Sequence, residues 1–281
     1  MNGKMNNVNR MWIVFFLLLL LAGCGYLSWH IWNILPFGNI GKWLLVGLLA
    51  ACMVCFFTNF IFGLDNKPMA VGSVLYEVGN SSIFVALYLA MIFIALDLGR
   101  LARLIPKSFF YHNGVASLGI FLFVFGLFLY GNLHYYNKVR VPLVLKSAKP
   151  LSKPVRMVMM TDLHLGYHNR VDEFRKWIDK VNLEQPDLVL IGGDIVDGSI
   201  RAIREQGMAE EFRRLKAPVY ACLGNHEYYG GRKEAMRFYE DAGIRLLIDE
   251  VAKVTVRMVP TRLSLSDATI VPIRAGRVYG H

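Results

Sequence analysis

Three short clusters of polar residues carry side chains that can bind metal ions and move protons. They are TDLHLG at 161–166, GGDIVDG at 192–198 and GNHE at 224–227. Each cluster directly follows a short apolar run of the kind that forms a buried strand. Charged and imidazole groups placed next to a buried strand are costly unless they bind something. We therefore expect the three clusters to build one binding site.

The residue types indicate a cation site. Asp162 and His164 are two positions apart, so on an extended segment their side chains point to the same side and reach one ion. Oxygen and imidazole donors without a thiolate suit manganese, iron or zinc. Glycines next to Asp194 and Asn225 leave room for a ligand to approach the backbone.

The elements around these clusters alternate between strand and helix. The apolar and periodic segments predict strands at 155–160, 187–191, 218–223 and 244–248, and helices at 171–181, 203–215 and 232–242. Strands separated by helices of this length are typical of an α/β layered domain, whose ligand loops lie at the carboxyl ends of the strands.

The motifs D-x-H, G-D-x-x-D and G-N-H-E, in this order on successive strand ends, resemble the calcineurin-like metallophosphoesterase family. The resemblance covers about residues 155–248, and the hydrophobic helices before it resemble the membrane-anchored bacterial branch. It implies part of a metallophosphoesterase-like β-sandwich flanked by helices. It also implies a hydrolase that cleaves phosphoric mono- or diesters with two divalent metal ions (Mn, Fe or Zn).

The resemblance assigns metal-binding roles to four residues. Asp162 and His164 bind the first ion, and Asp194 bridges the two ions. Asn225 binds the second ion and is able to touch a phosphate oxygen. A bridging ligand needs two anionic oxygens, so the family pattern requires Asp rather than Asn at position 194.

Catalysis is assigned to His226 and Asp197. His226 donates a proton to the leaving oxygen or stabilises the phosphoryl charge, and Asp197 orients its ring. Asp197 also fits a helix N-cap, and the two roles are compatible. We interpret Glu227 as a hydrogen-bond acceptor behind the ligands, and His168 as a solvated loop histidine rather than a substrate contact.

The first half of the chain is apolar. Up to position 133 it holds seven of the 31 Lys and Arg residues and three of the 21 acids. Four stretches, at about 11–27, 43–62, 82–98 and 114–133, are long enough to cross a bilayer. We interpret Asp97, near the end of the third, as a paired or solvated acid rather than a functional one. Cys52 and Cys55 are interpreted as packing residues.

The flanking charges predict the topology. With four spans, the side that holds the second half of the chain has nine Lys or Arg residues and the other side has four. This bias places the soluble half in the cytoplasm and the chain in the cell membrane as a multi-pass protein. A basic linker with three prolines follows the spans and is expected either to lie along membrane lipids or to act only as a stop-transfer flank.

The charge balance also bears on partners. The net charge of +10 divides into +4 and +6 between the two halves, so neither half is a polycation built for nucleic acid. The expected partners are membrane lipids and a phosphoester substrate, for which the membrane anchor favours a lipid-linked molecule. The oligomeric state does not follow from the sequence.

The family pattern continues with further histidines that complete both metal shells, but no histidine lies between His226 and His281. We therefore expect 1–133 to be a membrane domain, 134–154 a basic linker, 155–250 a partial metallophosphoesterase domain and 251–281 an atypical, frame-shifted tail. With imidazole ligands missing, we predict little or no hydrolase activity from this truncated chain. The alternative is a non-catalytic membrane module whose remnant domain binds a partner.

Overall fold

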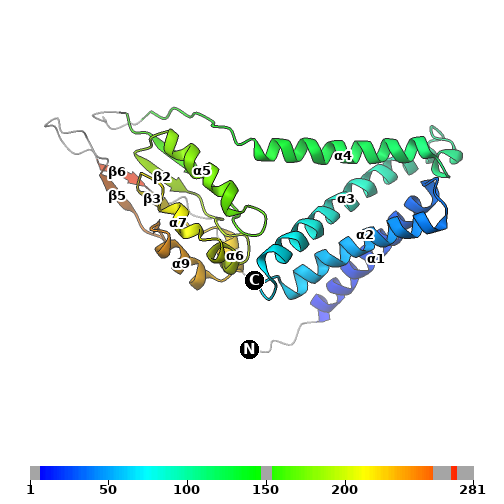
Figure 1. The fold of residues 1–281 in the computed structure, drawn as a ribbon, viewed down its shortest axis with the longest axis horizontal. Helices are drawn as coiled ribbons and strands as arrows, with labels where there is room; N and C mark the ends of the chain where they lie inside the picture. The colour runs from blue at the N-terminus through cyan, green and yellow to red at the C-terminus, as the bar shows by residue number, and fades with distance from the viewer. Residues whose placement is uncertain (1–6, 147–153, 256–266, 271–281) are drawn as a thin grey trace. The chain divides into compact units, whose positions relative to one another are not determined.

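The computed structural model of the 281-residue chain describes residues 7–146, 154–255 and 267–270 (Figure 1). It divides into two compact units. The first, here called the helical unit, contains Met1–Gly63 and Val74–Pro142. The second, here called the α/β unit, contains Leu143–His281 together with the short segment Leu64–Ser73.

Long apolar helices build the first part of the chain. They are α1 (Asn7–Ile34), α2 (Asn39–Phe62), α3 (Met69–Leu101) and α4 (Gly114–Tyr136), with the 3₁₀ helix η1 (Lys107–Phe110) before α4. Among the described residues, three helices are long and apolar enough to cross a membrane: α2, α3 and α4. The described part of α1, Leu18–Ile34, is apolar but shorter. Of the four predicted spans, the first, at 11–27, therefore stays a prediction.

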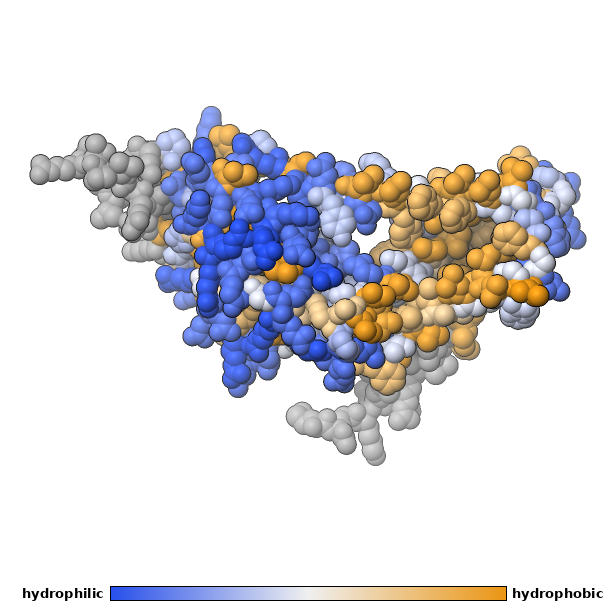
Figure 2. Space-filling model, viewed as in Figure 1, coloured by the Kyte–Doolittle hydropathy of each residue, from blue (hydrophilic) through white to orange (hydrophobic). Residues whose placement is uncertain are grey.

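Helix α3 is much longer than the predicted span at 82–98. It begins at Met69, because the small and polar residues of its first turns are compatible with a helix even though they dilute its hydropathy. Most large side chains of these helices face outward, as Figure 2 shows by their orange surface. Leu122 of α4, for example, is 54% exposed. An outward apolar surface of this extent is typical of contact with lipid.

Inside the helical unit, Asp97 of α3 is paired. Its carboxylate accepts a hydrogen bond from the Tyr26 hydroxyl at 2.8 Å and lies 2.9 Å from Nε2 of His30. His30 is buried and stacks on the ring of Phe93. The interpretation of Asp97 as a paired acid agrees with this geometry, and the pair ties α1 to α3.

The α/β unit is built on a parallel sheet in the order β1-β2-β3-β4. The strands are β1 (Met157–Met160), β2 (Leu188–Ile191), β3 (Val219–Ala221) and β4 (Arg245–Leu246). The helices are α5 (Val171–Leu183), α6 (Ile200–Glu205), α7 (Met208–Phe212), α8 (Asn225–Tyr229) and α9 (Arg232–Asp241). A fifth and sixth strand, β5 (Ala252–Thr255) and β6 (Asp267–Ile270), form a separate antiparallel pair.

The sheet and its helices enclose one apolar core. Helix α5 shows how the sequence achieves this: Phe174, Trp177, Ile178 and Val181 recur at helical spacing and are all buried. Its first turn carries Asp172 and Glu173, which favour a helix N-terminus. The strands contribute fully buried side chains such as Val189. The predicted α/β layered fold, consistent with a partial metallophosphoesterase domain, is confirmed.

The structure corrects two elements. The helix predicted at 203–215 is divided into α6 and α7, because Gly207 adopts a left-handed conformation with φ of 65° between them. The predicted tail at 251–281 contains β5 and, beyond an undescribed stretch, β6. Much of that tail, and part of the predicted linker at 134–154, lies outside the described residues.

Candidate metal centre

The three polar clusters meet at one edge of the parallel sheet. The loops that contain them follow β1, β2 and β3, and parallel strands end on the same side. The register of the pairing, with Met160 opposite Ile191 and Ile191 opposite Ala221, brings the three strand ends level. The side chains that follow them are therefore neighbours in space.

Asp162, His164 and Asp194 form the first group of possible metal ligands. One ligand atom from each lies within 4.8 Å of the others. Nε2 of His164 is 3.8 Å from Oδ1 of Asp162, and Oδ2 of Asp162 accepts a hydrogen bond from the Thr161 hydroxyl. Two carboxylates this close together repel each other and attract a divalent cation, and the imidazole adds a neutral nitrogen donor. The donor set fits manganese, iron or zinc.

The backbone at these three residues is unusual. Asp162, His164 and Asp194 all have positive φ, at 53°, 42° and 51°. Residues other than glycine rarely adopt this left-handed region, and such conformations persist where the surrounding structure enforces them. Here hydrogen bonds from the His164 amide to the Asp194 carbonyl and from Leu165 to Ile195 join the two loops. The chain thus holds three ligand candidates in a conformation that they do not prefer.

His164, Asp197 and His226 form a second group within the same 4.8 Å limit. Oδ1 of Asp197 lies 3.7 Å from Nδ1 of His226 and 4.0 Å from Nδ1 of His164. The two imidazole rings meet edge to face at 4.4 Å. Asp197 therefore faces both rings, and its carboxylate is placed to orient either of them.

Glu227 fastens the loops from behind. It is fully buried, and its carboxylate accepts hydrogen bonds from four backbone N–H groups at 2.7–3.1 Å. These groups belong to Asp194, Ile195, Val196 and Gly224. That Glu227 supports the metal ligands stays a prediction, but its carboxylate does accept these hydrogen bonds. One carboxylate joins the loop after β2 to the loop after β3.

Two glycines allow these loops to approach each other. A Cβ atom on Gly193 would lie 2.5 Å from the amide nitrogen of Gly224, and one on Gly224 would lie 2.2 Å from the Asp194 carboxylate. Gly193 also has a φ of 89°. Glycine is required at both positions because any side chain would force Asp194 away from the site.

Two neutral groups lie behind Glu227. Burial and the adjacent Glu227 charge raise the pKa of Tyr239 far above its usual value, so its hydroxyl remains a donor at neutral pH. Burial also raises the pKa of the Cys222 thiol, so Cys222 is not a thiolate that competes as a metal ligand. Cys222 directly precedes the third polar cluster in the sequence, whereas Tyr239 is brought to the site by the fold.

The predicted second-metal ligand Asn225 is the first residue of α8 and is exposed. The short helix α8 was not predicted, since the GNHE motif gives no helical period over five residues. A residue that sequence reasoning missed is Asn169. Its buried side-chain amide donates to the carbonyls of Leu163 and His164 and so holds the first ligand loop.

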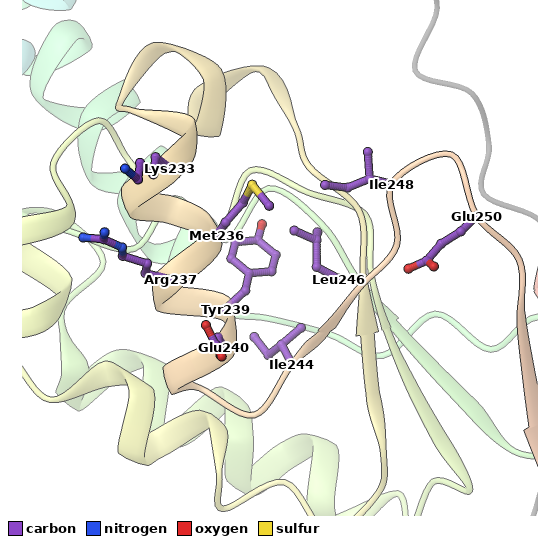
Figure 3. Close-up of a pocket in the computed structure, with 9 residues that line it drawn as sticks. All are labelled: Lys233, Met236, Arg237, Tyr239, Glu240, Ile244, Leu246, Ile248 and Glu250. Atoms are coloured by element: carbon purple, nitrogen blue, oxygen red, sulfur yellow. The ribbon is translucent and has the colours of Figure 1, made fainter.

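A cavity of about 600 Å³ lies away from these ligands, between α9 and β4 (Figure 3). Its lining includes Met236, Tyr239, Ile244 and Leu246, and the charged groups around it are mostly at its rim. None of the candidate metal ligands lines it. We therefore place the chemistry at the strand ends rather than in this cavity.

Comparison with known proteins agrees with the motifs. Residues 155–270 match the family model of the calcineurin-like phosphoesterases. An uncharacterised metallophosphoesterase of Campylobacter jejuni is 39% identical over 87 residues, which cover 31% of this chain and 23% of the relative. No solved structure matches the chain.

Two animal relatives are similar over the helices as well. A putative metallophosphoesterase of Caenorhabditis elegans is 27% identical over 80% of this chain and 48% of its own length. A transmembrane protein with a metallophosphoesterase domain from Danio rerio is 27% identical over 75% of this chain and 49% of its own length. The chain spans about half the length, or less, of these relatives.

The resemblance to metallophosphoesterases implies divalent metal ions, and the described residues offer two groups of side chains able to hold them. The family match continues to residue 270, beyond the boundary predicted at residue 250. The chain thus combines apolar helices able to cross a membrane with a segment that matches the calcineurin-like phosphoesterase family.

Proposed function

We propose that the protein is a membrane-anchored, metal-dependent phosphoesterase that hydrolyses phosphoric mono- or diesters by a two-metal mechanism. The observation that carries the proposal is the convergence of Asp162, His164 and Asp194 within 4.8 Å, each on a left-handed backbone. Ligand sets of this kind, held against conformational preference at strand ends, are typical of functional sites.

The residues divide the binding between two ions. Asp162, His164 and Asp194 would hold the first, while Asp194 and Asn225 would hold the second. Two divalent cations bound there would supply a water of lowered pKa and neutralise phosphoryl charge during hydrolysis. The His226 amide donates to Oδ1 of Asp194 at 2.9 Å, and this hydrogen bond fixes the orientation of the bridging carboxylate.

His226 is the proton donor to the leaving oxygen. Its ring is about one-third exposed, so a substrate reaches it, and Asp197 lies against its Nδ1 atom. Asp197 lies on the Nδ1 side of the ring and leaves Nε2 directed away from it, available for proton transfer. Substitution of Asp197 is therefore expected to lower the rate of turnover by releasing the orientation of the ring.

The substrate class follows from the covalent tether. The segment that holds the metal ligands continues from helices able to cross a membrane, so phosphoesters of lipids are at high local concentration. We propose a lipid-linked phosphoester as substrate and the cytoplasmic side of the cell membrane as its location. Nucleic acid is not expected as a partner.

The two ions differ in the number of ligands that the described residues offer. The proposed scheme assigns three of them to metal one and two, Asp194 and Asn225, to metal two. Loss of ligands or of the groups that support them weakens metal binding by about 10–100-fold each. The second ion is therefore the weaker one, and hydrolysis is expected to require metal concentrations that saturate it.

The test uses the full chain purified in detergent, with Mn²⁺ titrated by calorimetry and hydrolysis of bis(p-nitrophenyl) phosphate followed by absorbance. We expect metal-dependent turnover, and we expect Asp194→Asn to abolish turnover and weaken Mn²⁺ binding at least tenfold. The matched control is Asp249→Asn, an exposed acid with a similar positive φ of 52°. Unchanged Mn²⁺ binding in Asp194→Asn would contradict the proposal and favour the partner-binding module.

A further inference from the structure

The segment Leu64–Ser73, which connects α2 to α3 and includes the first residues of α3, packs within the α/β unit. Leu64 is 6% exposed, although it follows directly after an apolar helix whose side chains mostly face outward. Gly72 lies against Tyr167 so closely that an added Cβ would come within 2.8 Å of the tyrosine ring. The segment is thus seated on the surface of that unit rather than extended away from it.

The contacts of this segment converge on the ligand loops. Oδ1 of Asp65 accepts a hydrogen bond from the Tyr167 hydroxyl at 3.3 Å and another from the Ser199 hydroxyl at 2.5 Å. Tyr167 is three residues after His164, and Ser199 is two residues after Asp197. One carboxylate oxygen therefore bridges the loop after β1 and the loop after β2.

Neighbouring groups hold Asp65 in place. The guanidinium of Arg201 donates to the backbone carbonyls of Asp65 and Lys67, and it is itself paired with Glu205. Tyr167 is 4% exposed, and burial together with the Asp65 charge raises the pKa of its hydroxyl. Tyr167 therefore remains a neutral donor to Asp65 at physiological pH.

The two bridged loops also contact each other through their backbones. Leu165 donates to Ile195, and Asp197 donates to Leu165. Glu227 joins the loops after β2 and β3, whereas Asp65 joins the loops after β1 and β2. Together the two carboxylates connect all three ligand loops.

We propose that Asp65 is a positioning residue for the metal centre: the connection between α2 and α3 holds His164 and Asp197 in register through Tyr167 and Ser199. The metal-binding part of this inference rests on the proposed function. The structural part does not, because the hydrogen bonds of Asp65 are made to Tyr167 and Ser199 and involve no metal ligand. A change at the α2–α3 connection is thereby transmitted to the ligands.

The deciding experiment measures hydrogen–deuterium exchange of the full chain in detergent without metal. Asp65→Ala is expected to raise amide exchange roughly tenfold in peptides covering 163–169 and 194–200, since hydrogen bonds to a charged group are worth about that factor. Asp65→Asn keeps an acceptor oxygen and is expected to restore most of the protection. Asp249→Asn is the control and should leave both loops unchanged.

A second pair of variants keeps the inference testable if Asp65→Ala fails to fold. Tyr167→Phe and Ser199→Ala each remove one donor, and each is expected to loosen chiefly its own loop.

Calorimetry then tests the link to the metal: Asp65→Ala should bind Mn²⁺ about tenfold more weakly, and Asp65→Asn close to normally. Unchanged exchange in both loops, or equal loosening across the whole unit, would overturn the role of Asp65. Absence of Mn²⁺ binding in every protein, with the loop effect intact, would instead count against the proposed function alone.

Discussion

The two units of this chain expose the same apolar residue types for opposite reasons. Leu122 of α4 is 54% exposed and Leu183 at the end of α5 is 79% exposed. Leu122 belongs to a helix that is apolar on all sides, whereas Leu183 ends a helix whose other apolar residues are buried. An exposed leucine is informative only with its surroundings: the first indicates lipid as solvent, and the second is an isolated surface residue.

The units also differ in how they treat charge. The helical unit pairs its few polar groups within the helix packing, as Asp97 does with His30 and Tyr26. The α/β unit buries Glu227 completely and satisfies it with four backbone N–H groups. The loops that carry the ligands of the α/β unit therefore depend on hydrogen bonds to the Glu227 carboxylate. The helical unit depends instead on contact between its apolar surface and lipid.

The strongest test of this contrast is Glu227→Ala. Removal of the carboxylate leaves four buried N–H groups without an acceptor, which costs about 3–5 kcal/mol of the unfolding free energy. We expect the α/β unit to unfold at much lower denaturant, as followed by Trp177 fluorescence, while helical circular dichroism from the helical unit persists. Glu250→Ala, at an exposed acid, is the control and should leave the transition in place.

Replacement of each exposed leucine by lysine tests whether that position faces lipid or water. Leu122→Lys puts a lysine near the middle of α4 and is expected to oppose membrane insertion by about 3 kcal/mol. Leu183→Lys is expected to change the unfolding free energy by no more than about 0.5 kcal/mol. Glycosylation mapping of α4 insertion measures the first and chemical denaturation the second. Normal insertion of the Leu122→Lys variant would contradict the lipid-facing assignment.

A smaller effect than those of Glu227→Ala and Leu122→Lys concerns the surface ion pairs of the α/β unit. Glu211 bridges α7 to Arg175 of α5 at 2.9 Å and also pairs with Arg214. Burial raises the pKa of Glu211, but the two arginines outweigh it and lower the pKa overall. A lowered carboxyl pKa gives stability that is present above the ordinary Glu pKa and is lost as pH falls through the folded-state value.

Glu211→Gln is therefore expected to destabilise the α/β unit by about 1 kcal/mol at pH 7 and to have no effect well below pH 4, where both proteins are uncharged at this position. Thermal denaturation at a series of pH values measures the difference. A destabilisation that is the same at both pH values would mean that shape, not charge, matters at position 211.

Much of the α/β unit could be predicted because its signals are local. The apolar period of α5 and the apolar runs of β1 and β2 appear in a few adjacent residues. The sequence also showed that each polar cluster follows a predicted strand and predicted that the clusters build one site. The structure brings Asp162, His164 and Asp194 together. Their roles in binding or catalysis stay predictions.

What the sequence could not supply is contact between distant segments. Nothing near Asp65 indicates that it meets Tyr167 and Ser199, which are more than 100 positions away. The break at Gly207 was missed because apolar spacing continues across it, and the start of α3 was missed because polar residues lower the local hydropathy. Long-range hydrogen bonds leave no periodic pattern in the chain.

The left-handed backbone at Asp162, His164 and Asp194 has a consequence for how this protein can change. Glycine adopts that conformation at no steric cost, so its introduction at any of the three positions relieves about 1 kcal/mol of strain while it deletes a donor atom. Variants selected for heat resistance alone should therefore drift toward glycine at these sites. Retention of the acids and the imidazole under such selection would be direct evidence that binding, rather than folding, keeps them there.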